Sequence, residues 1–201
     1  MNDNLASLGY RMPAEWEKQS STWLAWPHNK NDWPDKFENI PSTFAKITSA
    51  LSKVQNVDIL IQSKIVKKNI KKILIKEQTN LNRVNFHIIK TNRVWTRDTG
   101  PIFLVNDLLK KKIMTNFHFN AWAKYKDYNF DNAIKPQIAK IKNIELIDVK
   151  AKIKNKIKDV ILEGGAIDVN GKGTLIATKE CLLSKVQERN PGLSRKKLEI
   201  I

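Results

Sequence analysis

Apolar residues recur along the chain with two different periods, which predicts a mixture of helices and strands. Between residues 41 and 54 they stand three and four positions apart, as on one face of a helix that begins at Pro41-Ser42. Residues 57–61 form a continuous apolar run that is typical of a buried strand, apart from Asp58. Residues 65–75 predict an amphipathic helix with its lysines outside, and residues 84–89 predict another strand. This order indicates an α/β fold.

A similar order returns later in the chain. Residues 102–105 and 113–119 predict a hairpin, and residues 144–149 predict a strand. Residues 131–142 predict a helix in which Pro136 must lie near the first turn or break the helix. The lysine-rich residues 150–158 are expected to form an exposed turn or a short helix. Asn170-Gly171 lies between two short apolar runs and predicts a second hairpin. A final helix is expected to begin at Ser194.

The recurrence indicates a repeated α/β module of roughly 60 to 70 residues. Repeated sheet units that each contribute a site residue suggest a radial arrangement around a central cleft. We divide the chain into modules of approximately residues 1–125 and 126–201. Because the last expected helix covers barely two turns before Ile201, we expect the chain to be the N-terminal portion of a single larger domain whose C-terminal portion is absent.

One carboxylate precedes the hairpin in each module. Asp98 and Glu163 both stand in the pattern acid-x-Gly-x-Ile, and Trp95 precedes the first acid by three residues. A glycine beside an acid lets a ligand approach the backbone, and two carboxylates with an aromatic ring suit a planar cation such as a guanidinium. The alternative is that both acids stabilise turns and that Trp95 packs in the core.

The formal net charge of +16 raises the possibility of a nucleic-acid partner. The lysines, however, are spread through residues 64–76, 110–112, 135–158 and 196–197, mostly alternating with Ile and Asn on expected solvated faces. No nucleic-acid-binding signature accompanies them, so we expect no nucleic-acid partner. Charges on the surface are screened beyond about 10 Å, so they do not exclude a cationic ligand from a pocket.

Cysteine and histidine usage excludes several other classes of site. Cys181 is the single cysteine, so an internal disulfide is impossible and a reducing cytoplasm is the expected location. The three histidines stand apart from one another and from Cys181, so no metal site is expected. No apolar run approaches the roughly 18 residues of a membrane span, and no secretory leader is recognised, so we expect no membrane association.

Several long motifs resemble the agmatine deiminase family, also called the bacterial-type peptidylarginine deiminase family. The resemblance implies a five-module α/β propeller, the pentein fold of guanidino-group-modifying enzymes. It implies hydrolysis of agmatine to N-carbamoylputrescine and ammonia in putrescine biosynthesis, without metal or cofactor, by a full-length protein that we expect to be a homo-oligomer. The motifs are Met12-Pro-Ala-Glu-Trp16, Thr22-Trp-Leu-Ala-Trp-Pro-His28, Trp95-Thr-Arg-Asp-Thr-Gly-Pro101, Phe119-Asn-Ala-Trp122 with Lys124-Tyr125, Leu162-Glu-Gly-Gly165 and Arg189-Asn-Pro191.

The family's site residues carry over by these motifs. Asp98 resembles the acid that grips the guanidinium nitrogens, and Glu163 resembles the acid that contacts substrate and orients a histidine, with Gly164 beside it. Trp95 resembles a wall of the substrate pocket, and Trp122 is a second candidate for that wall. In the family a cysteine thiolate attacks the guanidinium carbon, ammonia leaves, and water hydrolyses the covalent thiouronium intermediate.

The chain also departs from the family pattern. The family's histidine lies in a downstream Gly-His-x-Asp segment and its nucleophilic cysteine lies near the C-terminus, and neither is present here. Cys181 resembles a non-catalytic part of the family, and Ala123 stands where a glycine is usual. We therefore expect the isolated chain to be inactive. The alternatives are a deiminase of peptidyl- or free arginine, and a truncated, non-catalytic guanidinium-binding protein.

Overall fold

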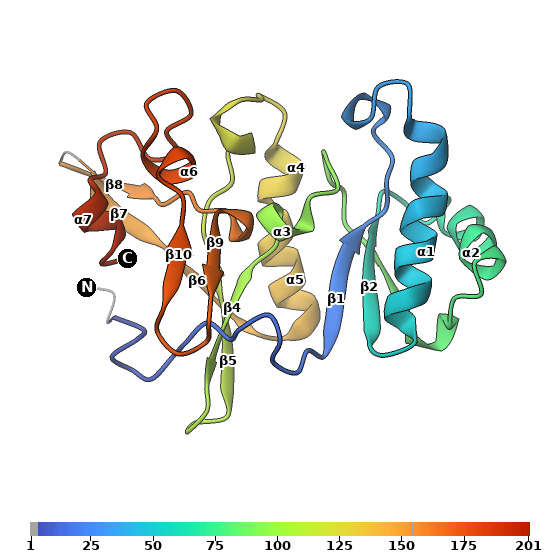
Figure 1. The fold of residues 1–201 in the computed structure, drawn as a ribbon, viewed down its shortest axis with the longest axis horizontal. Coiled ribbons are helices and arrows are strands. Elements are labelled where there is room, and N and C mark those ends of the chain that lie inside the picture. Colours follow the sequence, from blue (N-terminus) through green and yellow to red (C-terminus); the bar gives the residue numbers. More distant parts are fainter. Residues whose placement is uncertain (1–3, 154) are drawn as a thin grey trace. The chain divides into compact units, whose positions relative to one another are not determined.

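A computed structural model describes residues 4–153 and 155–201, and in it the chain divides into two units (Figure 1). One unit consists of residues 18–96, and the other combines the N-terminal segment up to Glu17 with residues 97–201. The unit of residues 18–96 therefore interrupts the other unit in sequence. Each unit has its own sheets and helices.

A parallel sheet in the order β1-β2-β3 is the centre of residues 18–96. Its strands are β1 (Ser21–Ala25), β2 (Asn56–Ile61) and β3 (Val84–Ile88), and the crossovers between them contain α1 (Ile40–Ser52) and α2 (Lys67–Lys76). Both helices lie on the same side of the sheet (Figure 1). Short 3-10 turns cover Lys30–Asp32, Phe37–Asn39 and Leu81–Arg83.

The core of this unit forms where apolar faces of both helices meet the central strand. Its buried members are Trp26, Ala45, Val57, Ile59, Ile61, Ile70 and Leu74. Asp58 of β2 is also buried, and its Oδ1 pairs with His87 Nε2 at 2.7 Å. The His87 ring stacks on Trp23 with 4.9 Å between ring centroids. A buried carboxylate in a central strand is tolerated because it has this partner.

The other unit contains a mixed sheet in the order β4-β5-β6. Strands β4 (Ile102–Asn106) and β5 (Lys111–Asn116) form the expected antiparallel hairpin, and β6 (Glu145–Asp148) pairs with β5 in parallel. The connection from β5 to β6 contains the turn Ala121–Ala123 and helices α4 (Asn129–Asn132) and α5 (Ile134–Lys142). Pro136 lies in the first turn of α5, where its missing N–H removes no helical hydrogen bond.

Two further hairpins complete this unit. Strands β9 (Ile167–Val169) and β10 (Leu175–Ala177) pair across the expected Asn170-Gly171 turn. Strands β7 (Lys150–Ile153) and β8 (Lys156–Asp159) pair where an exposed turn or short helix was expected, so that prediction was wrong. Ala151 and Ile153 alternate with lysines at the two-residue period of a strand, which the high lysine content obscured. Short helices α6 (Lys179–Leu183) and α7 (Arg195–Leu198) follow, the latter beginning after Ser194 as expected.

The N-terminal segment is attached to this unit through Arg11. Backbone groups of Arg11 and Val105 form an antiparallel bridge next to the end of β4. The Arg11 guanidinium donates to both carboxylate oxygens of Glu17, to Asp107 Oδ2 and to the carbonyl oxygen of Gly171. Asp107 follows β4 and Gly171 lies between β9 and β10. Arg11 therefore joins the turns of two hairpins.

The α/β class expected from the sequence is confirmed. Each of the two acids also precedes the first strand of an antiparallel hairpin, Asp98 before β4 and Glu163 before β9. Within residues 4–153 and 155–201 no sheet closes into a barrel or a propeller. The five-module propeller and the division into modules 1–125 and 126–201 stay predictions.

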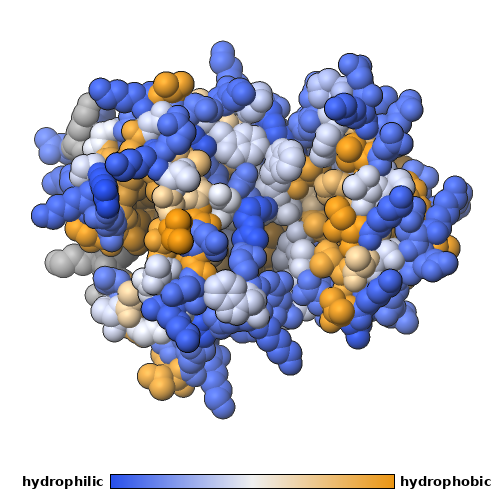
Figure 2. Space-filling model, in the orientation of Figure 1, coloured by the Kyte–Doolittle hydropathy of each residue, from blue (hydrophilic) through white to orange (hydrophobic). Residues whose placement is uncertain are grey.

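Hydrophilic residues cover much of the face that Figure 2 shows, and hydrophobic residues form small groups between them. Lys68, Lys71, Lys72 and Lys76 of α2 are exposed, as their helical spacing predicts. Lys135 is an exception to the expected solvated faces, because it is only 1% exposed. It shares a face of α5 with Ile138 and Ala139, three and four residues further on. Among the described helices none is long and apolar enough to cross a membrane.

Candidate functional site

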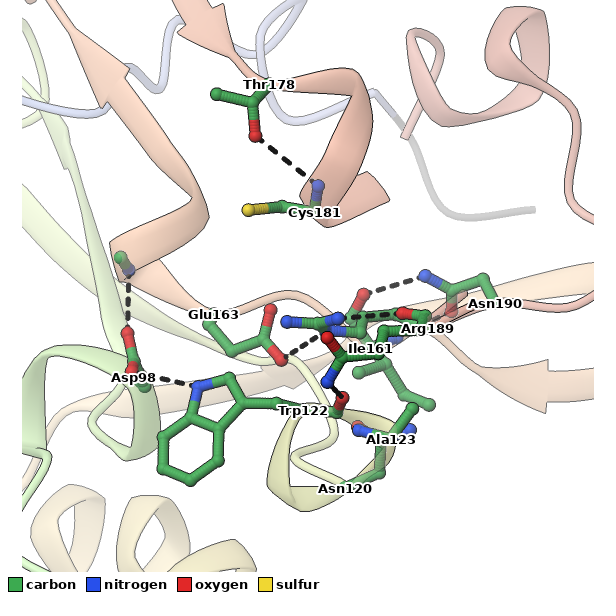
Figure 3. Close-up of polar contacts among 12 residues, drawn as sticks. Asp98, Asn120, Trp122, Ala123, Ile161, Glu163, Thr178, Cys181, Arg189 and Asn190 are labelled. Carbon is green, nitrogen blue, oxygen red and sulfur yellow. Dashed lines mark hydrogen bonds and ion pairs between the residues drawn. The ribbon is translucent and has the colours of Figure 1, made fainter. Parts of the chain in front are cut away.

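Asp98 lies in the short helical turn α3 (Thr96–Thr99), between β3 and β4. Its Oδ2 accepts a hydrogen bond from Trp122 Nε1 at 3.1 Å, and its Oδ1 accepts one from the backbone N–H of Gly165 at 3.1 Å (Figure 3). Burial raises the pKa of the Asp98 carboxyl, while the hydrogen bonds from Trp122 and Gly165 and the charges of Arg97 and Arg189 oppose that rise. The structure therefore orients this carboxylate through both of its oxygens.

Glu163 is 1% exposed and immediately precedes the 3-10 turn Gly164–Ala166. Its Oε1 accepts a hydrogen bond from Arg189 Nε at 3.0 Å, forming a buried ion pair. Arg189 also donates to the carbonyl oxygen of Gln187 at 2.7 Å. Oε2 of Glu163 has no hydrogen-bond partner among the residues that the structure describes. One oxygen of the carboxylate is thus fixed, and the other is left for a further donor.

Gly164 and Gly165 explain how the segment after Glu163 packs against Asp98. A Cβ atom on Gly164 would lie 2.6 Å from the carbonyl oxygen of Arg97, and one on Gly165 would lie 2.2 Å from Asp98 Oδ1. Both distances are far inside van der Waals contact. The two glycines are required because the two acid-bearing segments approach each other this closely.

Trp122 lies in a strained turn next to Asp98. Ala121, Trp122 and Ala123 all have positive φ angles, of 50°, 60° and 56°. The Oδ1 atom of Asn120 accepts a hydrogen bond from the Ala123 N–H at 3.0 Å and so stabilises the turn. The Trp122 ring packs edge-on against Phe119, with 5.2 Å between centroids. The left-handed conformation of Ala123 gives a physical reason why a glycine is usual at this position.

The contacts of Arg189 and Asn190 were not foreseen from the sequence. Asn190 Oδ1 accepts from the N–H of Ile161 at 2.9 Å, and Asn190 Nδ2 donates to the carbonyl oxygen of Ile161 at 2.8 Å (Figure 3). These bonds hold the chain two residues before Glu163, while Arg189 holds the carboxylate itself. The Arg189-Asn-Pro191 motif marked this segment, but nothing in its spacing predicted the pairing with residues about thirty positions earlier.

Trp95 belongs to the unit of residues 18–96, whereas the two acids belong to the other unit. Its side chain is 45% exposed, and its ring centroid lies 6.2 Å from that of Trp33 in the same unit. This exposure argues against the alternative in which Trp95 packs in the core. Its role as a wall of the substrate pocket stays a prediction.

Cys181 is partly buried in α6, and its backbone N–H donates to Thr178 Oγ1 at 3.3 Å. No polar contact drawn in Figure 3 joins its side chain to the network around Asp98 and Glu163. Within the described part of the chain, no group of three or more His, Cys, Asp or Glu side chains is arranged to hold a metal ion. The arrangement offers instead two carboxylates and an indole, which suit binding of a small cation, and a buried guanidinium that orients Glu163.

Comparisons with known proteins agree with this chemistry. A family model described as Porphyromonas-type peptidyl-arginine deiminase matches residues 11–201. The agmatine deiminase of Ectopseudomonas mendocina is 31% identical over 199 residues, which are 96% of this chain and 49% of that protein. The agmatine deiminase of Pseudomonas syringae pv. tomato is 27% identical over 208 residues, covering all of this chain and 51% of that protein. The chain thus spans about half the length of the curated relatives it matches.

Solved structures give the same result. The structure of the agmatine deiminase of Enterococcus faecalis matches with a TM-score of 0.82 and 27% identity, over 99% of this chain and 51% of that one. A substrate-bound agmatine deiminase of C. jejuni matches with a TM-score of 0.75 and 28% identity, over 94% of this chain and 51% of that one.

Proposed function

The chain belongs to the Porphyromonas-type peptidyl-arginine deiminase family, and from this premise we propose that it supplies the guanidinium-binding acids of an agmatine deiminase. The reaction is hydrolysis of agmatine to N-carbamoylputrescine and ammonia, as part of putrescine synthesis in the cytoplasm. In this proposal Asp98 and Glu163 bind the guanidinium group, and Trp95, Trp122 and Gly164 line the space around it.

The observation that carries the proposal is the network that joins the two acids. Gly165 directly follows Gly164 after Glu163 and donates to Asp98, and Trp122 donates to the other oxygen of Asp98. Glu163 keeps Oε2 without a hydrogen-bond partner among the described residues while Arg189 holds Oε1. Two oriented carboxylates within one hydrogen-bonded network are a suitable receptor for the N–H groups of a planar cation.

The chemistry requires such a receptor because a guanidinium carbon is weakly electrophilic. Its positive charge is delocalised over three nitrogens, so carboxylates must hold the group in one plane while a nucleophile approaches its face. In the proposed sequence a thiolate forms a bond to the carbon, and ammonia leaves with the electrons of the broken C–N bond. Water then replaces the sulfur. The thiolate and the histidine that activates water are assigned to segments of the whole protein outside these 201 residues.

The first experiment measures ammonia release from agmatine. It uses the chain itself and the full reading frame of its source, each in wild-type form and with Asp98→Ala. Glu145→Gln, which alters an exposed carboxylate on β6, is the matched control. We expect activity in the longer protein, loss of activity on Asp98→Ala and no change with Glu145→Gln. Full activity of the Asp98→Ala protein, or no activity in the wild-type longer protein, would contradict the proposal.

Two alternatives are distinguished by the same assay together with a measurement of agmatine binding. A deiminase of free or peptidyl-arginine would release ammonia from those substrates in preference to agmatine. A non-catalytic guanidinium-binding protein would bind agmatine in an Asp98-dependent manner and release no ammonia in either form.

A further inference from the structure

Lys135 is a buried cation in the same unit as the two proposed guanidinium-binding acids. It lies in the first turn of α5 and is 1% exposed. Its Nζ has no hydrogen-bond partner among the residues that the structure describes, and the same is true of Glu163 Oε2. Two buried charged groups with incomplete hydrogen bonding are unusual within one cluster, because each costs free energy in the folded state.

The electrostatic neighbours of Lys135 come from several segments. Glu163 exerts the largest stabilising effect on its charge, followed by Asp131 of α4. His118, which precedes the strained turn at Trp122, is repelled by the Lys135 charge. Burial and this repulsion lower the pKa of His118, so His118 is neutral when the solution is mildly alkaline.

Lys135 differs from Arg189 in that it can lose its charge near neutral pH. Burial lowers the pKa of Lys135 to about 8, although Glu163 and Asp131 act in the opposite direction. An arginine guanidinium, in contrast, cannot be deprotonated in proteins. A guanidinium cation that binds beside Asp98 and Glu163 is repelled by the positive charges of Lys135 and Arg189. Of these two groups, only Lys135 is able to lose its charge.

We propose that Lys135 gives up its ammonium proton when a guanidinium cation binds to Asp98 and Glu163, an inference that rests on the proposed function. One cation enters the cluster and one proton leaves to the buffer, so the total charge of the cluster is unchanged. Lys135 is thus a positioning residue that acts through Glu163 and does not itself touch the ligand. Cation binding becomes tighter as the solution becomes more alkaline.

The test is calorimetric titration of the 201-residue chain with n-butylguanidinium, whose own charge is constant over the range used. Titrations at about pH 7 and about pH 9, in buffers of different ionisation enthalpy, report both affinity and proton release. About nine-tenths of Lys135 is protonated one unit below its pKa, so we expect binding about tenfold tighter at the higher pH. We expect close to one proton to be released per cation bound at the lower pH.

Three variants separate charge from packing. Lys135→Met, similar in length and neutral, is expected to bind about tenfold more tightly than wild type at about pH 7, without pH dependence and without proton release. Lys135→Arg keeps a permanent charge and is expected to bind weakly at both pH values. Lys140→Met removes an exposed lysine from the same helix and is expected to behave as wild type. Circular dichroism checks that all three fold.

The outcomes distinguish this inference from the proposed function. Wild-type binding that depends on Asp98 but shows no proton release would overturn the role of Lys135 alone. The same conclusion follows if Lys135→Met retains the wild-type pH dependence. Absence of any guanidinium binding by the wild-type chain, at either pH, would overturn the proposed function and this inference with it.

Discussion

Gly165→Ala is the substitution that probes the junction between the two acids most directly. The added Cβ would lie 2.2 Å from Asp98 Oδ1, whereas ordinary contact begins at 3.4 Å. The carboxylate oxygen must therefore move by about 1.2 Å, which breaks its hydrogen bond to the Gly165 N–H and rotates the other oxygen away from Trp122. Because Gly165 does not have a positive φ, the alanine itself adopts the required backbone without strain.

The expected loss of guanidinium affinity follows from the lost orientation of the Asp98 carboxylate. A hydrogen bond to a charged group contributes about 1.5 to 3 kcal/mol, so loss of one such bond to the ligand weakens guanidinium binding by about 10- to 100-fold. The free energy of unfolding is expected to change by less than about 1 kcal/mol, because the Asp98 side chain is partly exposed and is free to rotate.

Gly164→Ala is the matched comparison, one residue away. Its Cβ would meet the backbone carbonyl oxygen of Arg97 at 2.6 Å, and a backbone atom cannot rotate aside. We therefore expect this variant to lose about 1 to 3 kcal/mol of unfolding free energy in urea titrations. Calorimetry with n-butylguanidinium measures the binding of both. Wild-type affinity in the Gly165→Ala protein would refute the assignment of Asp98 as an oriented guanidinium receptor.

Three other substitutions test separate features. Ala123→Gly is expected to raise the free energy of unfolding by about 1 kcal/mol in urea titrations, since it relieves a left-handed alanine, and an unchanged or lower value would contradict this reasoning. Arg189→Met leaves Glu163 buried without its ion-pair partner and is expected to cost about 3 to 5 kcal/mol in the same measurement, whereas a loss below about 1 kcal/mol would show that the pair is not needed. Lys135 has a pKa of about 8 in the fold against 10.5 ordinarily, so the folded state favours the neutral amine. The contribution of Lys135 to wild-type stability should therefore increase by up to about 3 kcal/mol as pH rises from about 8 towards 10.5 and should be constant below about 8, where both states are protonated, and Lys135→Met should remove this dependence from thermal or urea unfolding curves.

Local patterns in the sequence predicted much of the fold. The apolar run of residues 57–61 identified β2, and helical spacing identified α1 and α2, because burial on one or both faces leaves a clear period. Asn170-Gly171 identified the β9–β10 hairpin through its turn chemistry. The β7–β8 hairpin was missed, because its strands are too short and too rich in lysine for two-residue alternation to be evident.

The positions of the two acids were predictable, but their surroundings were not. The shared pattern acid-x-Gly-x-Ile identified Asp98 and Glu163, since both precede hairpins. The bond from Gly165 to Asp98 spans 67 residues, and the pair of Glu163 with Arg189 spans 26. Such contacts depend on tertiary packing and leave no period in the sequence. Lys135 was assigned to the solvent for a related reason, because its charge outweighed its place on the apolar face of α5.

The attachment of Arg11 to the two hairpin turns constrains the order in which the chain acquires its structure during synthesis. Residues 18–96 have their own sheet and core and leave the ribosome early. Arg11 emerges before this unit, yet the carbonyl of Gly171 that Arg11 binds is made about 160 residues later. The unit that holds both acids therefore cannot be completed until Gly171 has been made, well after residues 18–96 have left the ribosome.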